Sequence, residues 1–127
     1  MTKIGEIYKC EICGNVVSVV EAGGGTLVCC GEDMVLLKAK LKESEGKEKH
    51  VPIIENKSNN VLVKVGSIDH PMIEEHYISL IQIFKGDKLT SEKKLYPGER
   101  PEAEFFIKYD KNLKARVYCN IHGLWTS

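Results

Sequence analysis

Five cysteines and four histidines are the residues of this chain whose types and spacing could do metal chemistry. Cys10 and Cys13 are separated by two residues, and the adjacent pair Cys29 and Cys30 follows after fifteen more. A C-x-x-C pair turns two thiolates toward one ion, and four thiolates suit tetrahedral zinc or iron. Neighbouring cysteines in an extended segment would point to opposite faces, so we expect a bend at this pair, which Gly31 would permit. The spacing predicts a mononuclear tetrathiolate site and leaves the choice between zinc and iron open.

The remaining cysteine and all the histidines form a second candidate set. Its members, which lie at or near the ends of expected strands or in connecting loops, are His50, His70, His76, Cys119 and His122. A rigid β-scaffold presents functional groups at such places. Imidazoles suit iron, copper, zinc and nickel, and one thiolate adds a strong electron donor. Five ligands on an ion that prefers six would leave one position open.

Other interpretations fit these residues less well. Buried free thiols are one alternative for the N-terminal cysteines. A thioredoxin-like redox pair would need its C-x-x-C at the start of a helix in a βαβ unit, and no such pattern surrounds Cys10. A copper electron-transfer site would use two histidines, one cysteine and a methionine after the last histidine, whereas "GLWTS" follows His122. A structural zinc site closes with four ligands, which the second set exceeds.

The composition is that of an ordinary globular protein, with 43% apolar and 28% charged residues. The 18 basic and 18 acidic residues give a formal net charge of zero, which argues against nucleic-acid binding by bulk electrostatics. No apolar run approaches the roughly 18 residues of a membrane span, and the first residues have no hydrophobic signal core. We therefore expect a cytoplasmic protein with reduced thiols, in which an odd number of cysteines favours ligands over disulfides.

The elements that must position these residues are expected to be β-strands in two domains. Residues 1–37 are short and glycine-rich, so they need a staple, which the four cysteines can supply. A polar stretch, "LKESEGKEKH", indicates a linker or exposed connection. Strand-like runs separated by turn signals then occupy 60–68, 76–99, 103–110 and 115–125. The pattern predicts an all-β fold, with domains at 1–37 and 38–127 and an antiparallel sandwich or barrel in the second.

Several motifs together resemble one family over essentially the whole chain. "YKCEICG" and "LVCCGEDM" are similar to the small desulforedoxin-like domain of desulfoferrodoxin, the two-iron form of superoxide reductase. "EKHVP", "VGSIDHPM", "EEHYI" and "YCNIHGLW" resemble its catalytic domain, in the same order. The segment "KESEGKEKHVP" differs in length and charge from the usual version of the family, which concerns the conformation of that loop.

The resemblance implies two iron ions per chain and an immunoglobulin-like β-sandwich as the catalytic domain. The first iron would be held by the four thiolates of Cys10, Cys13, Cys29 and Cys30. The second would have Cys119 as its axial thiolate and four equatorial imidazoles, from His50, His70, His76 and His122. The family also implies a homodimer and a rubredoxin-like electron donor.

The activity implied by the resemblance is the one-electron reduction of superoxide to hydrogen peroxide, without formation of oxygen, in oxygen detoxification. Lys49 would attract superoxide and organise proton delivery through water. Glu48 would occupy the sixth position in the oxidised resting state. The backbone N–H groups of Asn120, Ile121 and His122 could donate hydrogen bonds to the axial thiolate.

Two rival functions remain open at this point. One is a non-catalytic iron electron-transfer protein, and the other is a structural module with zinc in both sites. The sequence also leaves open whether the tetrathiolate iron passes electrons to the second iron or mainly staples its domain, and whether zinc takes its place.

Overall fold

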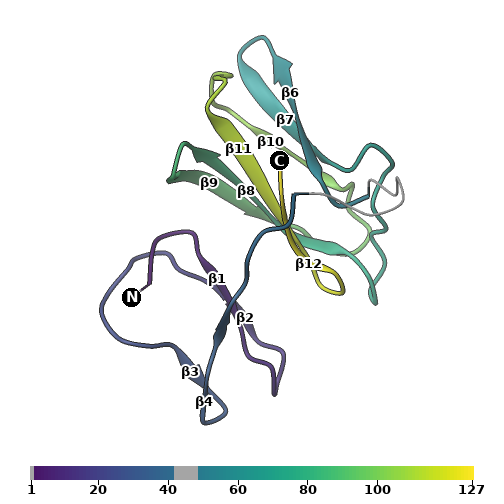
Figure 1. Cartoon of the computed structure of the whole chain (residues 1–127). Helices are drawn as coiled ribbons and strands as arrows, with labels where there is room; N and C mark the ends of the chain where they lie inside the picture. Colours follow the sequence, from purple (N-terminus) through teal and green to yellow (C-terminus); the bar gives the residue numbers. More distant parts are fainter. Residues whose placement is uncertain (1, 42–48) are drawn as a thin grey trace. The chain divides into compact units, whose positions relative to one another are not determined.

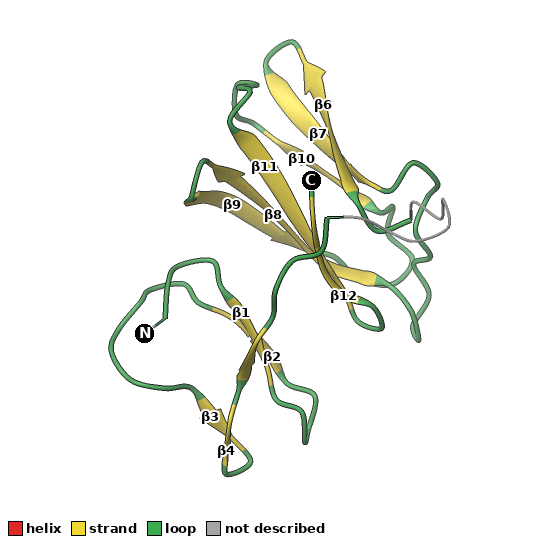
Figure 2. Ribbon diagram, in the orientation of Figure 1, coloured by secondary structure: helices red, strands yellow, loops and turns green. Residues whose placement is uncertain are grey.

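The computed structural model describes residues 2–41 and 49–127, and the chain divides into two compact units (Figure 1). We call them the N-terminal unit (Met1–Lys38) and the C-terminal unit (Ala39–Ser127). Both are built from strands joined by loops and turns, and the described ranges contain no helix (Figure 2). The predicted all-β class is confirmed. No helical segment in those ranges has the length and apolar character needed to cross a bilayer.

The N-terminal unit consists of short antiparallel strands. They are β1 (Ile7–Lys9), β2 (Val16–Ser18), β3 (Val28–Cys29), β4 (Glu32–Asp33) and β5 (Val35–Leu36). β1 pairs with both β2 and β5, and β3 and β4 form a separate hairpin. Among the described residues of this unit, the buried apolar side chains are Ile7, Cys10 and Val19. So small a core supplies little stability, which agrees with the expected need for a metal staple.

The C-terminal unit is a sandwich of two antiparallel sheets. Its strands are β6 (Pro52–Lys57), β7 (Asn60–Val65), β8 (Ile78–Lys85), β9 (Lys88–Lys94), β10 (Glu102–Phe105), β11 (Leu113–Cys119) and β12 (Gly123–Thr126). One sheet has the order β10-β7-β6 and the other β12-β11-β8-β9. Seven short antiparallel strands in two packed sheets are the arrangement of immunoglobulin-like domains. The predicted sandwich is confirmed.

Alternating side chains of the two sheets fill the space between them. On β7 the inward positions are Val61, Val63 and Val65, all fully buried. The facing sheet contributes Ile81 and Ile83 to the same hydrophobic cluster. The buried members of this core are apolar and, apart from Leu95, lie on strands. Cys119 is the one candidate ligand among them, so close packing forms a rigid base beneath the other ligands.

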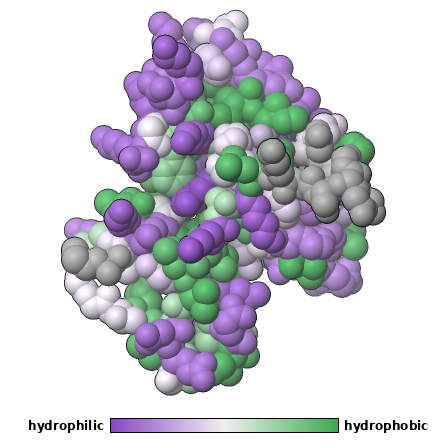
Figure 3. Space-filling view, in the orientation of Figure 1, coloured by the Kyte–Doolittle hydropathy of each residue, from purple (hydrophilic) through white to green (hydrophobic). Residues whose placement is uncertain are grey.

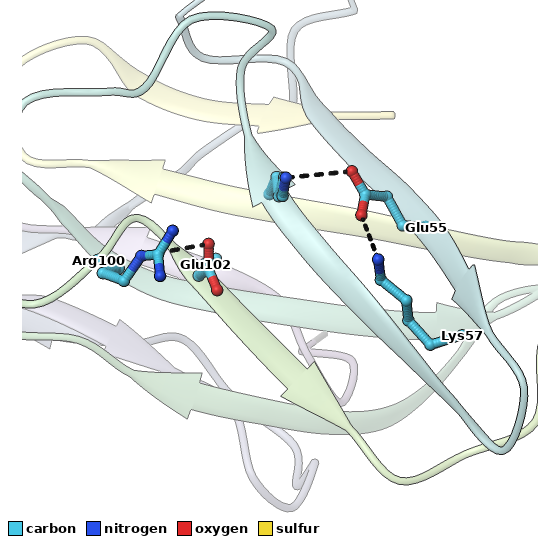
Figure 4. Close-up of polar contacts among 5 residues, drawn as sticks. Glu55, Lys57, Arg100 and Glu102 are labelled. Carbon is cyan, nitrogen blue, oxygen red and sulfur yellow. Dashed lines mark ion pairs between the residues drawn. The ribbon is translucent and has the colours of Figure 1, made fainter.

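Charged residues cover the outer faces of the strands, and hydrophilic and hydrophobic residues are interspersed on the face shown in Figure 3. Glu55 on the edge strand β6 pairs with Lys57 at 3.1 Å and with Lys64 at 3.4 Å (Figure 4). Arg100 pairs with Glu102 at 3.7 Å. Such exposed pairs add little stability, but charges along an edge strand oppose pairing with other chains.

Candidate metal centres

The adjacent cysteines Cys29 and Cys30 lie in the tightest turn of the N-terminal unit. Cys29 ends β3 and Glu32 begins β4, so Cys30 and Gly31 are the two central residues of the hairpin turn. Both have positive φ, 54° and 77°, which is the backbone of a type I′ turn. The expected bend is therefore confirmed, and it lies at Cys30 itself as well as at Gly31. It removes the alternation that would point the two thiols apart.

The four sulfur atoms of this unit converge on one point. They all lie within 4.8 Å of one another, with 3.6 Å between Cys13 and Cys29 and 3.9 Å between Cys29 and Cys30. Sulfurs bonded to one tetrahedral ion at about 2.3 Å lie roughly 3.8 Å apart. The C-x-x-C half is shaped by Gly14, whose φ is 83° and whose N–H donates to the carbonyl of Cys10 over 3.0 Å. The predicted set of four thiolates thus has the spacing of a tetrathiolate centre.

The protonation of these thiols shows why they need a cation. A hydrogen bond from the backbone N–H of Cys13 is the main cause that lowers the pKa of Cys10, to about 7. Contact with the Cys13 side chain is the main cause that raises the pKa of Cys30, to about 12. One thiolate therefore forms readily, whereas further thiolates so close together repel unless a positive ion lies among them. Asn15 Nδ2 lies 3.8 Å from the sulfur of Cys29 and donates a hydrogen bond to it.

The second candidate set gathers at the ends of strands in the C-terminal unit. Cys119 ends β11 and lies opposite Ile78, the first residue of the neighbouring strand β8. His76 lies two residues before that strand begins. The pairing of β11 with β8 shifts between Tyr118 and Cys119, which marks a β-bulge, a feature that often re-aims side chains beside functional sites.

The four imidazoles form a ring that is close to square. Neighbouring ring centroids are 4.7 Å apart for His50–His70, His70–His76 and His50–His122, and 4.9 Å apart for His76–His122. The diagonal His50–His76 measures 6.3 Å. Half of 6.3 Å is about 3.2 Å, which leaves room for a metal–nitrogen bond of about 2.1 Å to each ring.

One nitrogen pair tests this geometry directly. His50 Nε2 and His122 Nδ1 lie 3.0 Å apart. Two nitrogens bonded at right angles to one ion, each at about 2.1 Å, would also lie about 3.0 Å apart. The ligand atoms of His50, His76, Cys119 and His122 all lie within 4.8 Å of one another; His70 is outside that group of four but completes the ring of imidazoles.

The hydrogen bonding of His70 indicates what its free nitrogen is for. Nδ1 lies 2.7 Å from the carbonyl oxygen of Pro71, which can only accept, so Nδ1 carries the proton and Nε2 carries a lone pair. Nε2 of His70 and Nε2 of His76 are buried and have no hydrogen-bond partner among the described residues. Burial is also the main cause that lowers the pKa of His70, to about 4. Neutral, buried imidazoles with unused lone pairs are the form that binds a metal ion.

The thiol of Cys119 lies close to this ring, with its sulfur 3.8 Å from Nδ1 of His122. It is fully buried and continues the inward-facing series Leu113, Ala115 and Val117 of β11. The N–H of His122 donates to its sulfur over 3.4 Å, as expected. The N–H of Asn120, which could also have donated to this sulfur, donates instead to the carbonyl oxygen of Tyr77 over 3.2 Å. His122 is itself exposed, whereas His50 and His70 are buried, so solvent reaches the site at His122.

Lys49 is exposed and lies next to His50 in the chain. Burial is the main cause that lowers the pKa of His76, followed by the charges of His122, His50 and Lys49. The positive charge of Lys49 is the smallest of these causes. Glu48, the other residue expected to have a role here, lies outside the described residues.

Sequence reasoning missed three side chains that contact the ligand loops. Asn120 hydrogen-bonds with both neighbours of His76, and Trp125 stacks on His50 with Lys40 beside it. The available signals were the position of Asn120 between two candidate ligands and the fact that Trp125 is the single tryptophan of the chain.

Each β unit gathers its own ligand set, four thiolates in one unit and imidazoles with one thiolate in the other. This defines a protein with two mononuclear non-haem metal centres, and both sets fit iron. The desulfoferrodoxin family model matches residues 42–127, and the model of the desulfoferrodoxin N-terminal domain matches residues 2–37. The chain belongs to the desulfoferrodoxin family.

Individual relatives agree with this assignment. A desulfoferrodoxin homolog of Archaeoglobus fulgidus is 54% identical over 127 residues, covering 100% of this chain and 99% of that protein. Desulforedoxin of Megalodesulfovibrio gigas is 71% identical over 35 residues, covering 28% of this chain and 95% of that protein. The crystal structure of the superoxide reductase from Treponema pallidum matches with a TM-score of 0.72 and 25% identity, covering 96% of each chain.

Proposed function

We propose that this protein is a superoxide reductase. Superoxide takes up one electron and two protons and leaves as one hydrogen peroxide molecule, and no oxygen forms. The observation that carries the proposal is the near-square ring of four imidazoles together with a fully buried thiol within 4.8 Å of the ligand atoms of three of them. Iron bound in this set would supply the electron.

The residues of the C-terminal unit have separate roles in metal binding, substrate attraction and proton delivery. His50, His70, His76, His122 and Cys119 hold the iron. The buried Cys119 thiolate would donate electron density to bound iron, and its hydrogen bond from the His122 N–H would temper that donation. Lys49 attracts the anionic substrate and orders water for proton delivery. On the resemblance alone, we assign to Glu48 the role of a carboxylate that would bind the iron of the oxidised protein.

The N-terminal unit serves mainly as a stapled auxiliary domain. Its four thiolates hold a second iron, or zinc in its place. We assign this metal a structural role because the apolar core of the unit is too small to stabilise it alone. We place the functional domains at 1–37 and 38–127. This protein is a cytoplasmic homodimer whose substrate is superoxide. A separate, rubredoxin-like protein supplies its electrons.

The product ratio tests this proposal against its rivals. Iron-loaded, pre-reduced protein is exposed to a measured amount of superoxide, and peroxide and oxygen are determined. A reductase gives one peroxide per superoxide and no oxygen, whereas dismutation gives one peroxide per two superoxides together with oxygen. Iron and zinc per chain are measured on the same sample. Cys119→Ser is expected to abolish the reaction, with Ser79→Ala as a control in a strand.

The rivals predict other results. Reversible oxidation and reduction of both irons without consumption of superoxide would indicate an electron carrier. Zinc in both sites, even with iron supplied during expression, would indicate a structural module. Either outcome contradicts the proposal.

A further inference from the structure

Trp125 packs directly against a candidate iron ligand. Its indole is stacked on the imidazole of His50, with ring centroids 4.8 Å apart and planes inclined by 18°. The indole N–H donates to the carbonyl oxygen of His122 over 3.2 Å. Trp125 is 8% exposed and belongs to the core cluster, so its position is fixed by packing. One side chain thus fixes both the ring plane of His50 and the backbone of His122.

Lys40 contacts both Trp125 and the backbone of His122. Its backbone pairs with β12 through Lys40 N to Leu124 O at 2.9 Å and Thr126 N to Lys40 O at 2.8 Å. Its ammonium donates to the carbonyl oxygen of His122 over 3.0 Å and lies 4.9 Å from the centre of the Trp125 ring. A cation over an indole face is attracted by the ring quadrupole. The charge of Lys40 is therefore held beside the backbone of one ligand, His122, and beside the indole that stacks on another, His50.

A fixed positive charge has a definite effect on a redox metal. It repels the ferric ion, which carries one more positive charge, more than it repels the ferrous ion. The reduced form is favoured, and the reduction potential rises. Stacking of Trp125 adds a second effect, because an imidazole that cannot rotate loses less freedom when it binds a metal.

We propose that Trp125 and Lys40 are positioning residues for the iron site: Trp125 holds the His50 and His122 ligands in the ring, and Lys40 raises the reduction potential of the iron bound there. Neither residue touches the substrate. The inference rests on the proposed function, since it requires iron in the histidine site.

The test compares Lys40→Met, Lys40→Arg and wild type by potentiometric titration of the full chain, following the absorption of the histidine-bound iron. Lys114→Met removes the same charge five residues from Cys119, toward the other end of β11, and serves as the control. At the potential where the wild-type site is half reduced, the ratio of reduced to oxidised iron in Lys40→Met should be roughly two- to seventeenfold lower. This is the range of Coulomb's law for unit charges about 10 Å apart, between water and an effective dielectric constant of 20. Lys40→Arg should restore the wild-type ratio.

A second measurement needs no metal. Because Trp125 is the only tryptophan, the emission of the metal-free protein reports its contacts alone. Lys40→Met should shift the emission maximum, whereas Lys114→Met should leave it unchanged. In the loaded protein, Trp125→Leu should release the histidine-site iron to a chelator about tenfold faster or more, while the tetrathiolate metal stays bound.

The outcomes separate the two levels of the argument. A wild-type protein whose histidine site takes no iron overturns the proposed function and this inference with it. A site that binds iron with the same midpoint in wild type, Lys40→Met and Lys114→Met overturns the role of Lys40 alone. Equal iron release by wild type and Trp125→Leu overturns the role of Trp125.

Discussion

Asn120 and Tyr77 are joined by two hydrogen bonds, from Tyr77 N to Asn120 Oδ1 over 2.9 Å and from Asn120 N to Tyr77 O over 3.2 Å. Asn120 Nδ2 also donates to the carbonyl of Glu75 over 3.1 Å. The short segment that carries His76 is thereby attached on both sides to the loop that follows Cys119. This side chain therefore helps to set the spacing of ligands from two distant parts of the chain, together with the pairing of β11 and β8.

Replacing Asn120 by alanine should loosen the histidine site. Tyr77 N would lose its acceptor, at a cost of about 1–3 kcal/mol, and iron affinity should fall about 10–100-fold, as for other groups that orient ligands. Iron release to a chelator measures the effect, and the tetrathiolate metal should be retained. Asn112→Ala, in a turn at the other end of β11, is the control. Equal release by Asn120→Ala and wild type would show that the hydrogen bonds do not position His76.

Cys13→Ser should unfold the N-terminal unit and spare the C-terminal unit. Few apolar side chains are buried in the first unit, so its folding depends on metal binding. Metal content should drop by one ion per chain. Amide hydrogen exchange should show lost protection at β1, β2 and β5, with unchanged protection at β8 and β11. Retained protection at β1 would mean that the unit folds without its metal.

The core of the sandwich should respond to truncation much more than its surface does. Ile81 is fully buried between the sheets, so Ile81→Ala should cost about 2–5 kcal/mol of unfolding free energy. Ile53, 40% exposed on the edge strand β6, is the matched control, and its replacement by alanine should cost well under half as much. Denaturant unfolding of the C-terminal unit gives both values. Similar losses at both positions would contradict the assignment of the core.

Lys49→Met should slow the encounter with superoxide about tenfold at low ionic strength, because a charge near the site steers an anionic substrate. The deficit should shrink as salt is added, since screening removes the advantage of the wild type. Lys49→Arg should keep most of the rate, and Lys114→Met should keep all of it. Rates of superoxide consumption over a series of salt concentrations provide the measurement. A deficit that is the same at every salt concentration would point to a structural effect.

Local alternation predicted the β-class and a sandwich or barrel, and the local spacing of four cysteines predicted the tetrathiolate set. The second ligand set, which extends from His50 to His122, was grouped because it contains every remaining cysteine and histidine, and its roles came from the family resemblance. The sequence did not separate β6 from its surroundings. That strand begins at Pro52 and carries adjacent isoleucines, so its pattern lacks a clear period of two. The strands of the N-terminal unit, two or three residues long, are too short to show any period.

The side chains around the ligands could not be found in the same way. Contacts of Asn120 with Tyr77, and of Trp125 with His50, join residues 43 and 75 positions apart in the chain, and nothing in the spacing of either pair marks it. Such contacts arise only when the strands are paired and the loops meet. Lys40 is a further example, since its role depends on the bridge between its backbone and β12.

The type I′ turn at Cys30 and Gly31 makes chain reversal and metal binding inseparable. A side chain at Cys30 has to accept a left-handed backbone, which glycine or asparagine would adopt more easily. A residue inserted between Cys29 and Cys30 would change the hairpin register and move a sulfur at the same time. The turn length and the positions of the sulfur atoms therefore cannot change independently in related chains. We expect the length of this turn to be conserved as strictly as the cysteines themselves.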